Sequence, residues 1–272
     1  MAVAAARDSI LLDLWRYRGH IWRFTLQDLR GRYAGSAMGL LWAFLHPLAT
    51  LLIYTLVFSR LMSPSVPQVA GGCPLSFPLY LCVGLFPWVA LQDAIQRGSG
   101  AFVEHAPLLK KLYFPESVFV GKVVCSATVN LVISIALVLA LLLASGVSPA
   151  RAWLAVPLLV FLQQVLAFGL ALLGATLHVF FRDIGQLVSI GLQAWFWLTP
   201  IVYVASLLPE WVQPALWLNP AYHLIEAYHQ VLLTGQWPAP DHLGMLVAFS
   251  ALFAALARVV FVRLRPDLRD EI

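Results

Sequence analysis

Long apolar runs alternate along this chain with short segments that hold almost all of its charge. The first run, residues 36–58, follows Arg30 and Arg32 and meets no charged residue before Arg60. About 20 apolar residues in a helix cross a hydrocarbon core about 30 Å thick. Similar runs predict five further spans, over residues 79–96, 117–143, 153–180, 186–204 and 243–262. The pattern therefore predicts an all-α integral membrane protein, with six transmembrane helices in a single domain over residues 1–272.

Three glycines mark the start of the first predicted span. Gly31, Gly35 and Gly39 repeat every fourth residue, which places them on one face if the segment is helical. Small residues at this spacing let another helix approach closely, so we expect a packing face here. Pro47 lies further along the same span and is expected to kink the helix or break its hydrogen-bond ladder.

Residues 9–30 and 205–241 differ from the predicted spans. Residues 9–30 mix apolar anchors with arginines, which predicts an amphipathic helix on the cytoplasmic membrane surface, broken at Gly19. A helix that docks on a soluble partner is the alternative. Residues 205–241 are interrupted by five prolines, and no piece is long enough to cross a membrane. Short re-entrant or interfacial helices fit this outer segment best.

Composition and charge support this interpretation. The chain is 61% hydrophobic and 11% charged, whereas soluble domains have about 25% charged residues. Of the 17 lysines and arginines, all but Arg60 and Arg151 fall in segments assigned to the cytoplasm. This asymmetry predicts that both termini are cytoplasmic. Because the basic residues lie at the ends of apolar runs, they give no indication of nucleic-acid binding.

The sequence offers no convincing catalytic or metal centre. A phosphate-binding loop needs a Gly-Lys pair followed by Ser or Thr, but the one such pair, Gly121-Lys122, is followed by Val123. His223 and Glu226 have a metal-ligand spacing, but no second pair accompanies them. We therefore expect no metal, no cofactor and no ATPase activity in this chain. A disulfide between Cys73 and Cys82 is left open, although Cys82 falls in a predicted span.

Charged residues at span boundaries are the first candidate functional groups. Asp93 and Arg97 are four residues apart and would face each other on a helix, at the cytoplasmic end of the second span. Arg182 and Asp183 occupy the turn between the fourth and fifth spans, where Asp183 is placed to cap the next helix. Both pairs are interpreted as boundary ion pairs with a structural role, with energy transmission as the alternative. Glu226 is the acid of the outer segment that lies between apolar stretches, which makes it a candidate functional residue.

Aromatic residues near two spans are the second candidate group. Sugars pack their C–H faces on aromatic rings, and Tyr and Trp also hydrogen-bond to hydroxyl groups. A channel with such rings would hold a glycan weakly at many points, although a membrane aromatic belt and ordinary packing explain any single ring better. The residues proposed to line this channel are Tyr33, Tyr54, Trp195, Trp197 and Tyr203.

Several motifs together resemble one family over about residues 10–265. They are RYAGSAMGLLWAFLHPL, GLFPW, LLKKLYFP, VFFRDIGQLVSIGLQAWFWLTPIVY and LNPAYHLIEAYHQVLL. This order is similar to that of the membrane permeases of bacterial ABC exporters for polysaccharides, which include O-antigen, capsule and teichoic-acid exporters. The resemblance is greatest to the O-antigen branch. An ABC permease for a drug or small lipid, and less favourably a membrane enzyme that modifies glycans or lipids, remain as alternatives.

The resemblance implies partners as well as an activity. It implies a homodimer in the bacterial inner membrane, two separate ATPase subunits that bind ATP and Mg²⁺, and a lipid-linked polysaccharide as substrate. Membrane lipids and periplasmic or outer-membrane export proteins are further expected partners. The family's coupling helix, which docks on the ATPase, would lie in residues 97–115. Its candidate residues are Phe102, Glu104, His105, Leu108, Lys110 and Lys111.

Overall fold

The computed structural model describes residues 10–32, 35–61, 76–111, 114–205 and 208–272, in which every regular element is helical. The N-terminal half contains α2 (Ile10–Arg16), α3 (Arg18–Arg32), the short 3₁₀ helix η1 (Gly39–Leu41), α4 (Trp42–Leu61), α5 (Ser76–Glu104), α6 (Ala106–Lys111) and α7 (Ser117–Ala144). The C-terminal half contains η2 (Arg151–Ala155), α8 (Val156–Phe180), α9 (Ile184–Trp197), α10 (Gln213–Leu216), α11 (Pro220–His229), the π-helical turn η4 (Gln230–Thr234) and α12 (Pro240–Glu271).

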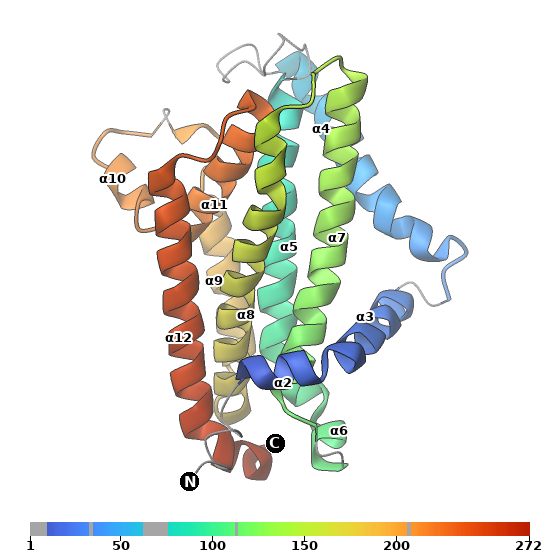
Figure 1. Cartoon of the computed structure of the whole chain (residues 1–272), viewed down its shortest axis with the longest axis vertical. Coiled ribbons are helices and arrows are strands. Elements are labelled where there is room, and N and C mark those ends of the chain that lie inside the picture. Colours follow the sequence, from blue (N-terminus) through green and yellow to red (C-terminus); the bar gives the residue numbers. More distant parts are fainter. Residues whose placement is uncertain (1–9, 33–34, 62–75, 112–113, 206–207) are drawn as a thin grey trace.

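The all-α membrane class is confirmed. Within the described residues, four helices are long and apolar enough to cross a membrane, namely α5, α7, α8 and α12. They run alongside one another with α5 inside the bundle (Figure 1), where α5 contacts α4, α7, α8, α9 and α11. Of the four, α5 is the most deeply buried, which explains its leucine- and aromatic-rich core. The apolar part of α4, Trp42–Ile53, and the 14-residue α9 are shorter.

The glycine packing face expected at the start of the first span is wrong. Gly35 and Gly39 have left-handed backbone conformations, with φ of +80° and +51°; Gly35 lies in a turn and Gly39 begins η1, so the two do not share one face of an α-helix. A Cβ added at either would meet nothing within 4 Å. The close helix approach occurs elsewhere, because a Cβ on Gly98 of α5 would lie 2.5 Å from Cβ of Ala171 on α8.

Four helix limits differ from the predicted spans. Helix α4 begins at Trp42 and not at residue 36, after the glycine turn, and it continues through Pro47. Helix α5 runs to Glu104, eight residues past the predicted end. Helix α9 ends at Trp197 and not at residue 204, because Pro200 has no N–H and disfavours helix in the residue before it. Helix α12 extends through the basic tail to Glu271.

The N-terminal helices α2 and α3 cross the end of the bundle where α6 and the end of α12 also lie (Figure 1). The break between them is at Tyr17, not at Gly19. Ile21, Thr25 and Leu29 of α3 are buried, and α3 packs on α7. Leu11, Leu12, Trp15 and Trp22 remain exposed on the other side. The short helices α10 and α11 of segment 205–241 lie at the opposite end of the bundle (Figure 1).

Candidate functional site

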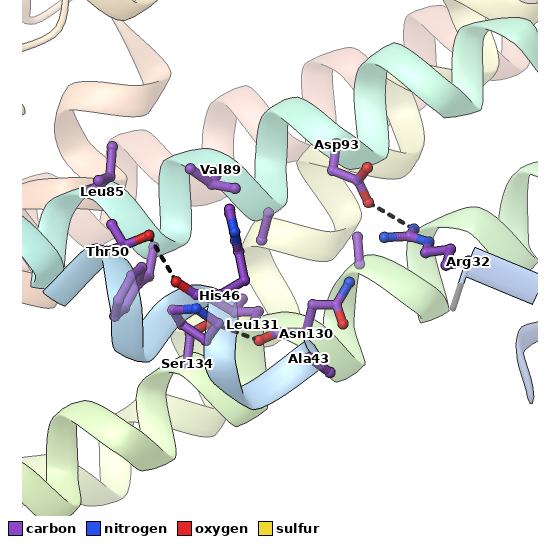
Figure 2. A pocket seen from close by; sticks show the side chains of 14 residues that line it. Arg32, Ala43, His46, Thr50, Leu85, Val89, Asp93, Asn130, Leu131 and Ser134 are labelled. Carbon is purple, nitrogen blue, oxygen red and sulfur yellow. Dashed lines mark hydrogen bonds and ion pairs between the residues drawn. The ribbon is translucent and has the colours of Figure 1, made fainter. Parts of the chain in front are cut away.

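A cavity of about 260 Å³ lies between α4, α5 and α7. Its walls combine apolar side chains of α5 with polar groups from the flanking helices (Figure 2). His46 and Thr50 lie one turn apart on α4, and Asn130 and Ser134 lie one turn apart on α7. The Thr50 and Ser134 hydroxyls donate to the carbonyls of His46 and Asn130, both at 2.9 Å. Oδ1 of Asn130 is buried and has no hydrogen-bond partner among the described residues, so it is available to a hydroxyl-bearing ligand.

One end of this cavity is closed by an ion-pair network that joins three helices. Nη2 of Arg97 on α5 donates to both carboxylate oxygens of Asp28 on α3, at 2.7 and 2.6 Å. Asp93 accepts from Arg97 at 3.3 Å and from Arg32 at 2.9 Å. Oγ of Ser126 on α7 donates to Asp28 at 2.7 Å. Two arginines and two aspartates therefore balance in charge, where single charges among apolar helices would be costly.

The network connects the cavity to the N-terminal surface helices, because Arg32 and Asp93 both line the cavity and belong to the network (Figure 2). The sequence pattern indicated the Asp93–Arg97 spacing. It gave no sign that Asp28, 69 residues before Arg97, shares the same arginine. A movement of α5 would change the contacts of the cavity wall and of α3 together.

The candidate coupling residues divide into exposed and buried groups. Glu104, Leu108, Lys110 and Lys111 are exposed at the end of α5 and along α6, and Leu108 is 43% exposed. Phe102 is fully buried and packs against the ring of Phe261 on α12, at 6.2 Å between centroids. Phe102 is therefore not exposed for direct docking, because the helix continues through this position and turns its side chain into the core, and its role in ATPase coupling stays a prediction. Val103 and Pro107, which sequence reasoning did not select, are exposed as well.

His105 occupies the junction between α5 and α6 as a half-buried hydrogen-bonded group. Its Nδ1 lies 2.9 Å from the carbonyl of Ala101, and its Nε2 lies 2.8 Å from Nζ of Lys122. A neutral ring that donates from Nδ1 and accepts at Nε2 satisfies both contacts. Burial, with a further contribution from the Lys122 charge, lowers the pKa of His105, although Glu104 and Asp28 act in the opposite direction.

Acidification is expected to destabilise the protein through His105. Because its pKa is lower in the folded than in the unfolded state, the unfolded chain binds more protons as the pH falls below about 6.5, the ordinary pKa of histidine. The free energy of unfolding should fall in that range by at most about 1.4 kcal/mol per pH unit. Melting temperatures in detergent between pH 7.5 and 5.5 measure this. H105Q, which retains an acceptor but does not titrate, should show a shallower decline, and parallel curves would contradict the assignment.

Trp195 and Trp197, two of the aromatic candidates, have different surroundings. The indole N–H of Trp195 donates to Oδ1 of Asn219 at 2.7 Å, and the ring of Trp195 packs edge-on against buried Trp88. Trp197 is 62% exposed, and its carbonyl accepts from the Tyr203 hydroxyl at 2.9 Å. Trp195 therefore holds α9 to the bundle, while Trp197 faces outward from it. Tyr33 and the side chain of Tyr54 lie outside the described part of the structure.

The three remaining candidates, Arg182, Asp183 and Glu226, do not line the cavity between α4, α5 and α7. Arg182 and Asp183 are both exposed, no ion pair joins them in the described part of the chain, and Asp183 makes no side-chain capping bond to α9. Their assignment as an ion pair and a cap is therefore wrong. Glu226 lines a second cavity of about 360 Å³ at the opposite end of the bundle, together with Tyr80 and Tyr222.

Three observations bear on metal, thiol and nucleotide chemistry. The described residues contain no group of three or more metal-ligating side chains. Cys82 is a buried free thiol, and Cys73 lies outside the described residues. Gly121 and Lys122 lie inside α7 and do not form a phosphate-binding loop.

Comparisons with known proteins agree on one class. A family model described as "ABC-2 type transporter" matches residues 20–233. The O-antigen export system permease protein RfbA of Myxococcus xanthus is 32% identical over 201 residues, which are 74% of each chain. RfbA of Klebsiella pneumoniae is 32% identical over 187 residues, covering 68% of this chain and 69% of that protein. The polysialic acid transport protein KpsM of Escherichia coli is 24% identical over 186 residues, covering 68% and 70%.

Proposed function

Because this chain belongs to the ABC-2 type transporter membrane family, we propose that it is the permease subunit of a bacterial exporter of lipid-linked polysaccharide. The observation that supports this most directly is the similarity to O-antigen export permeases over about three quarters of the chain. The weaker similarity to a polysialic acid transporter favours a glycan of O-antigen or capsule type. The chain itself would be a transport subunit without an ATPase site.

In this proposal the six spans are the four long helices together with α4 and α9, and segment 205–241 forms short re-entrant helices on the outer side. Both termini would be cytoplasmic. This orientation is supported by α2, α6 and the end of α12 sharing one end of the bundle (Figure 1), where Arg265 lies 3.8 Å from Asp13. Lys110 and Lys111 are at that end too, as the positive-inside rule requires.

A second copy of the chain would complete the channel. Helix α4 exposes Leu48, Leu52 and Leu56 along one side, and α9 exposes Ile190 and Trp197. Apolar faces suit lipid as well as protein, but a hydroxyl-rich glycan needs a passage that lipid does not fill. A passage between two copies would supply one, and Trp197 is placed on such an outward face.

The separate ATPase would act through α6 and α5. A rigid helix transmits displacement along its axis, and α5 runs without interruption from the network at Asp93 to Glu104, about 16 Å along the helix. Movement of α6 would thus shift Asp93 and Arg97 relative to Asp28 and reshape the cavity between α4, α5 and α7. The hydroxyl and amide groups of that cavity are suited to hydrogen-bonding sugar hydroxyls as the glycan enters.

The proposal is tested by co-expression of this chain with the separate ATPase subunit that the proposal requires, taken from the same bacterium. L108E, and separately a double variant carrying K110E and K111E, should reduce the co-purified ATPase at least tenfold, because each places new negative charge on the exposed face of α6. The melting temperature of both variants should equal that of the parent, because the side chains of Leu108, Lys110 and Lys111 are exposed. R151E, a charge reversal at an exposed site in η2, is the matched control. Full ATPase retention in both variants would argue against docking at α6.

A further inference from the structure

An apolar groove of about 380 Å³ runs between α8 and α12 on the outside of the bundle, and α2 lines its inner end. Small side chains of α12, Ala254, Ala255 and Ala257, leave the space, and Phe161 and Gln164 of α8 lie at its far end. From Phe161 to Leu172 the lining covers about 16 Å of helix, about half of a hydrocarbon core about 30 Å thick. The groove therefore matches the depth of one lipid leaflet.

Arg258 lies at the inner end of this groove and has no counter-ion among the described residues. From residue 240 to residue 258 the rise along α12 is about 27 Å, which places Arg258 near the inner boundary of the hydrocarbon. Within the described residues, no ion pair involves Arg258. Asp13, the acid of α2, contacts Arg265 at 3.8 Å. An arginine at this depth is stabilised by an anion, because an unpaired charge beside the hydrocarbon of a membrane is costly.

Helix α2 sets the level of the headgroups beside Arg258. Ile10 and Leu14 face the groove, while Leu12 and Trp15 are exposed on the surface of α2. Exposed leucine and tryptophan on a helix that crosses a bundle end are typical of a helix lying in the membrane interface. Arg16 ends α2 and Arg18 begins α3, and both add positive charge close to α2. The opening of the groove thus lies where lipid phosphates of the inner leaflet are found.

We propose that this groove binds one anionic phospholipid of the inner leaflet, with its phosphate against Arg258 and one acyl chain along α8 and α12. Charge complementarity favours an anionic over a zwitterionic headgroup, because Arg258 has no ion-pair partner in the described structure and Arg16 of α2 adds further positive charge. The apolar lining suits an acyl chain and offers little to a glycan. By bridging α2 and α12, the bound lipid would hold the surface helix, and with it the Asp28–Arg97 network, against the bundle.

The test measures lipid binding by the purified full-length protein in neutral detergent. Dioleoyl phosphatidylglycerol and dioleoyl phosphatidylcholine are added separately, and bound lipid is counted by native mass spectrometry while the melting temperature is recorded. Phosphatidylglycerol should bind at least tenfold more tightly and raise the melting temperature more. R258Q should remove this preference, and A255F, which fills the groove, should abolish retention of the lipid.

Matched controls keep the result interpretable. R263Q removes an exposed arginine from the same helix, and A251F adds the same ring at an exposed site outside the groove, so both should bind phosphatidylglycerol as the parent does. A255L, with a smaller side chain, should give an intermediate loss if A255F is poorly folded. Equal binding of the two lipids, or equal loss in R258Q and R263Q, would overturn the proposal. So would a change of oligomeric state in A255F, or tighter lipid binding after removal of residues 1–9, because another protein segment would then occupy the groove.

Discussion

Replacement of Glu116 by glutamine is expected to lower the free energy of unfolding by about 3–5 kcal/mol and the melting temperature by about 10 °C. The Glu116 side chain is 2% exposed and accepts from Nε of Arg269 at 2.7 Å and from Nε of Arg265 at 3.1 Å. An amide in its place removes the charge that balances two guanidinium groups and turns N–H donors toward them. The start of α7 and the end of α12 would then separate.

Thermal unfolding in detergent, followed by tryptophan fluorescence, measures this effect. E210Q is the matched control, because Glu210 is exposed in segment 205–241 and has no ion pair in the described structure. R269Q leaves Arg265 in contact with Glu116 and should therefore have a smaller effect than E116Q. If E116Q and E210Q melted at the same temperature, the Glu116 contacts would not hold α12 in place.

Replacement of Asp28 by asparagine should be the second large effect, at about 2–4 kcal/mol. The change removes the carboxylate to which Arg97 donates two hydrogen bonds. Asp93 is then left as the one acid of the network, facing two arginines. We expect less than for Glu116 because these side chains are 15–28% exposed, so water screens part of the charge. Polysaccharide export should fall as well, because movement of α5 would no longer be transmitted to α3 through the Asp28–Arg97 contacts.

A double-mutant cycle isolates the pair. D28N, R97Q and the combined variant should give a coupling energy of about 1–3 kcal/mol, because each single change leaves a partner charge uncompensated. D270N, at an exposed position near the end of α12, controls for loss of an aspartate. Additive effects of the two changes would mean that Asp28 and Arg97 do not act as one unit.

Helix ends and exposed side chains were the least predictable parts of the candidate site. The sequence pattern placed a connector over residues 97–115, but α5 continues through Gly98 and Gly100 to Glu104, and Gly98 packs closely against Ala171 of α8. Since successive residues of a helix point about 100° apart, that continuation buries Phe102 and exposes Val103 and Glu104. At Gly35 and Gly39 the sequence spacing suggested a packing face, while both glycines have left-handed backbone conformations.

The amino-acid sequence alone determined the membrane class, the helical content and the location of most spans, because the transfer of apolar side chains from water to lipid depends on local composition. It also indicated the Asp93–Arg97 pair, whose partners are one helical turn apart. Only the tertiary structure decided that Asp28 and Arg32 join that pair, that Glu116 balances the end of α12, and that Arg258 borders an apolar groove. These contacts link residues far apart in the chain, and their partners are selected by how the helices pack, which no local pattern records.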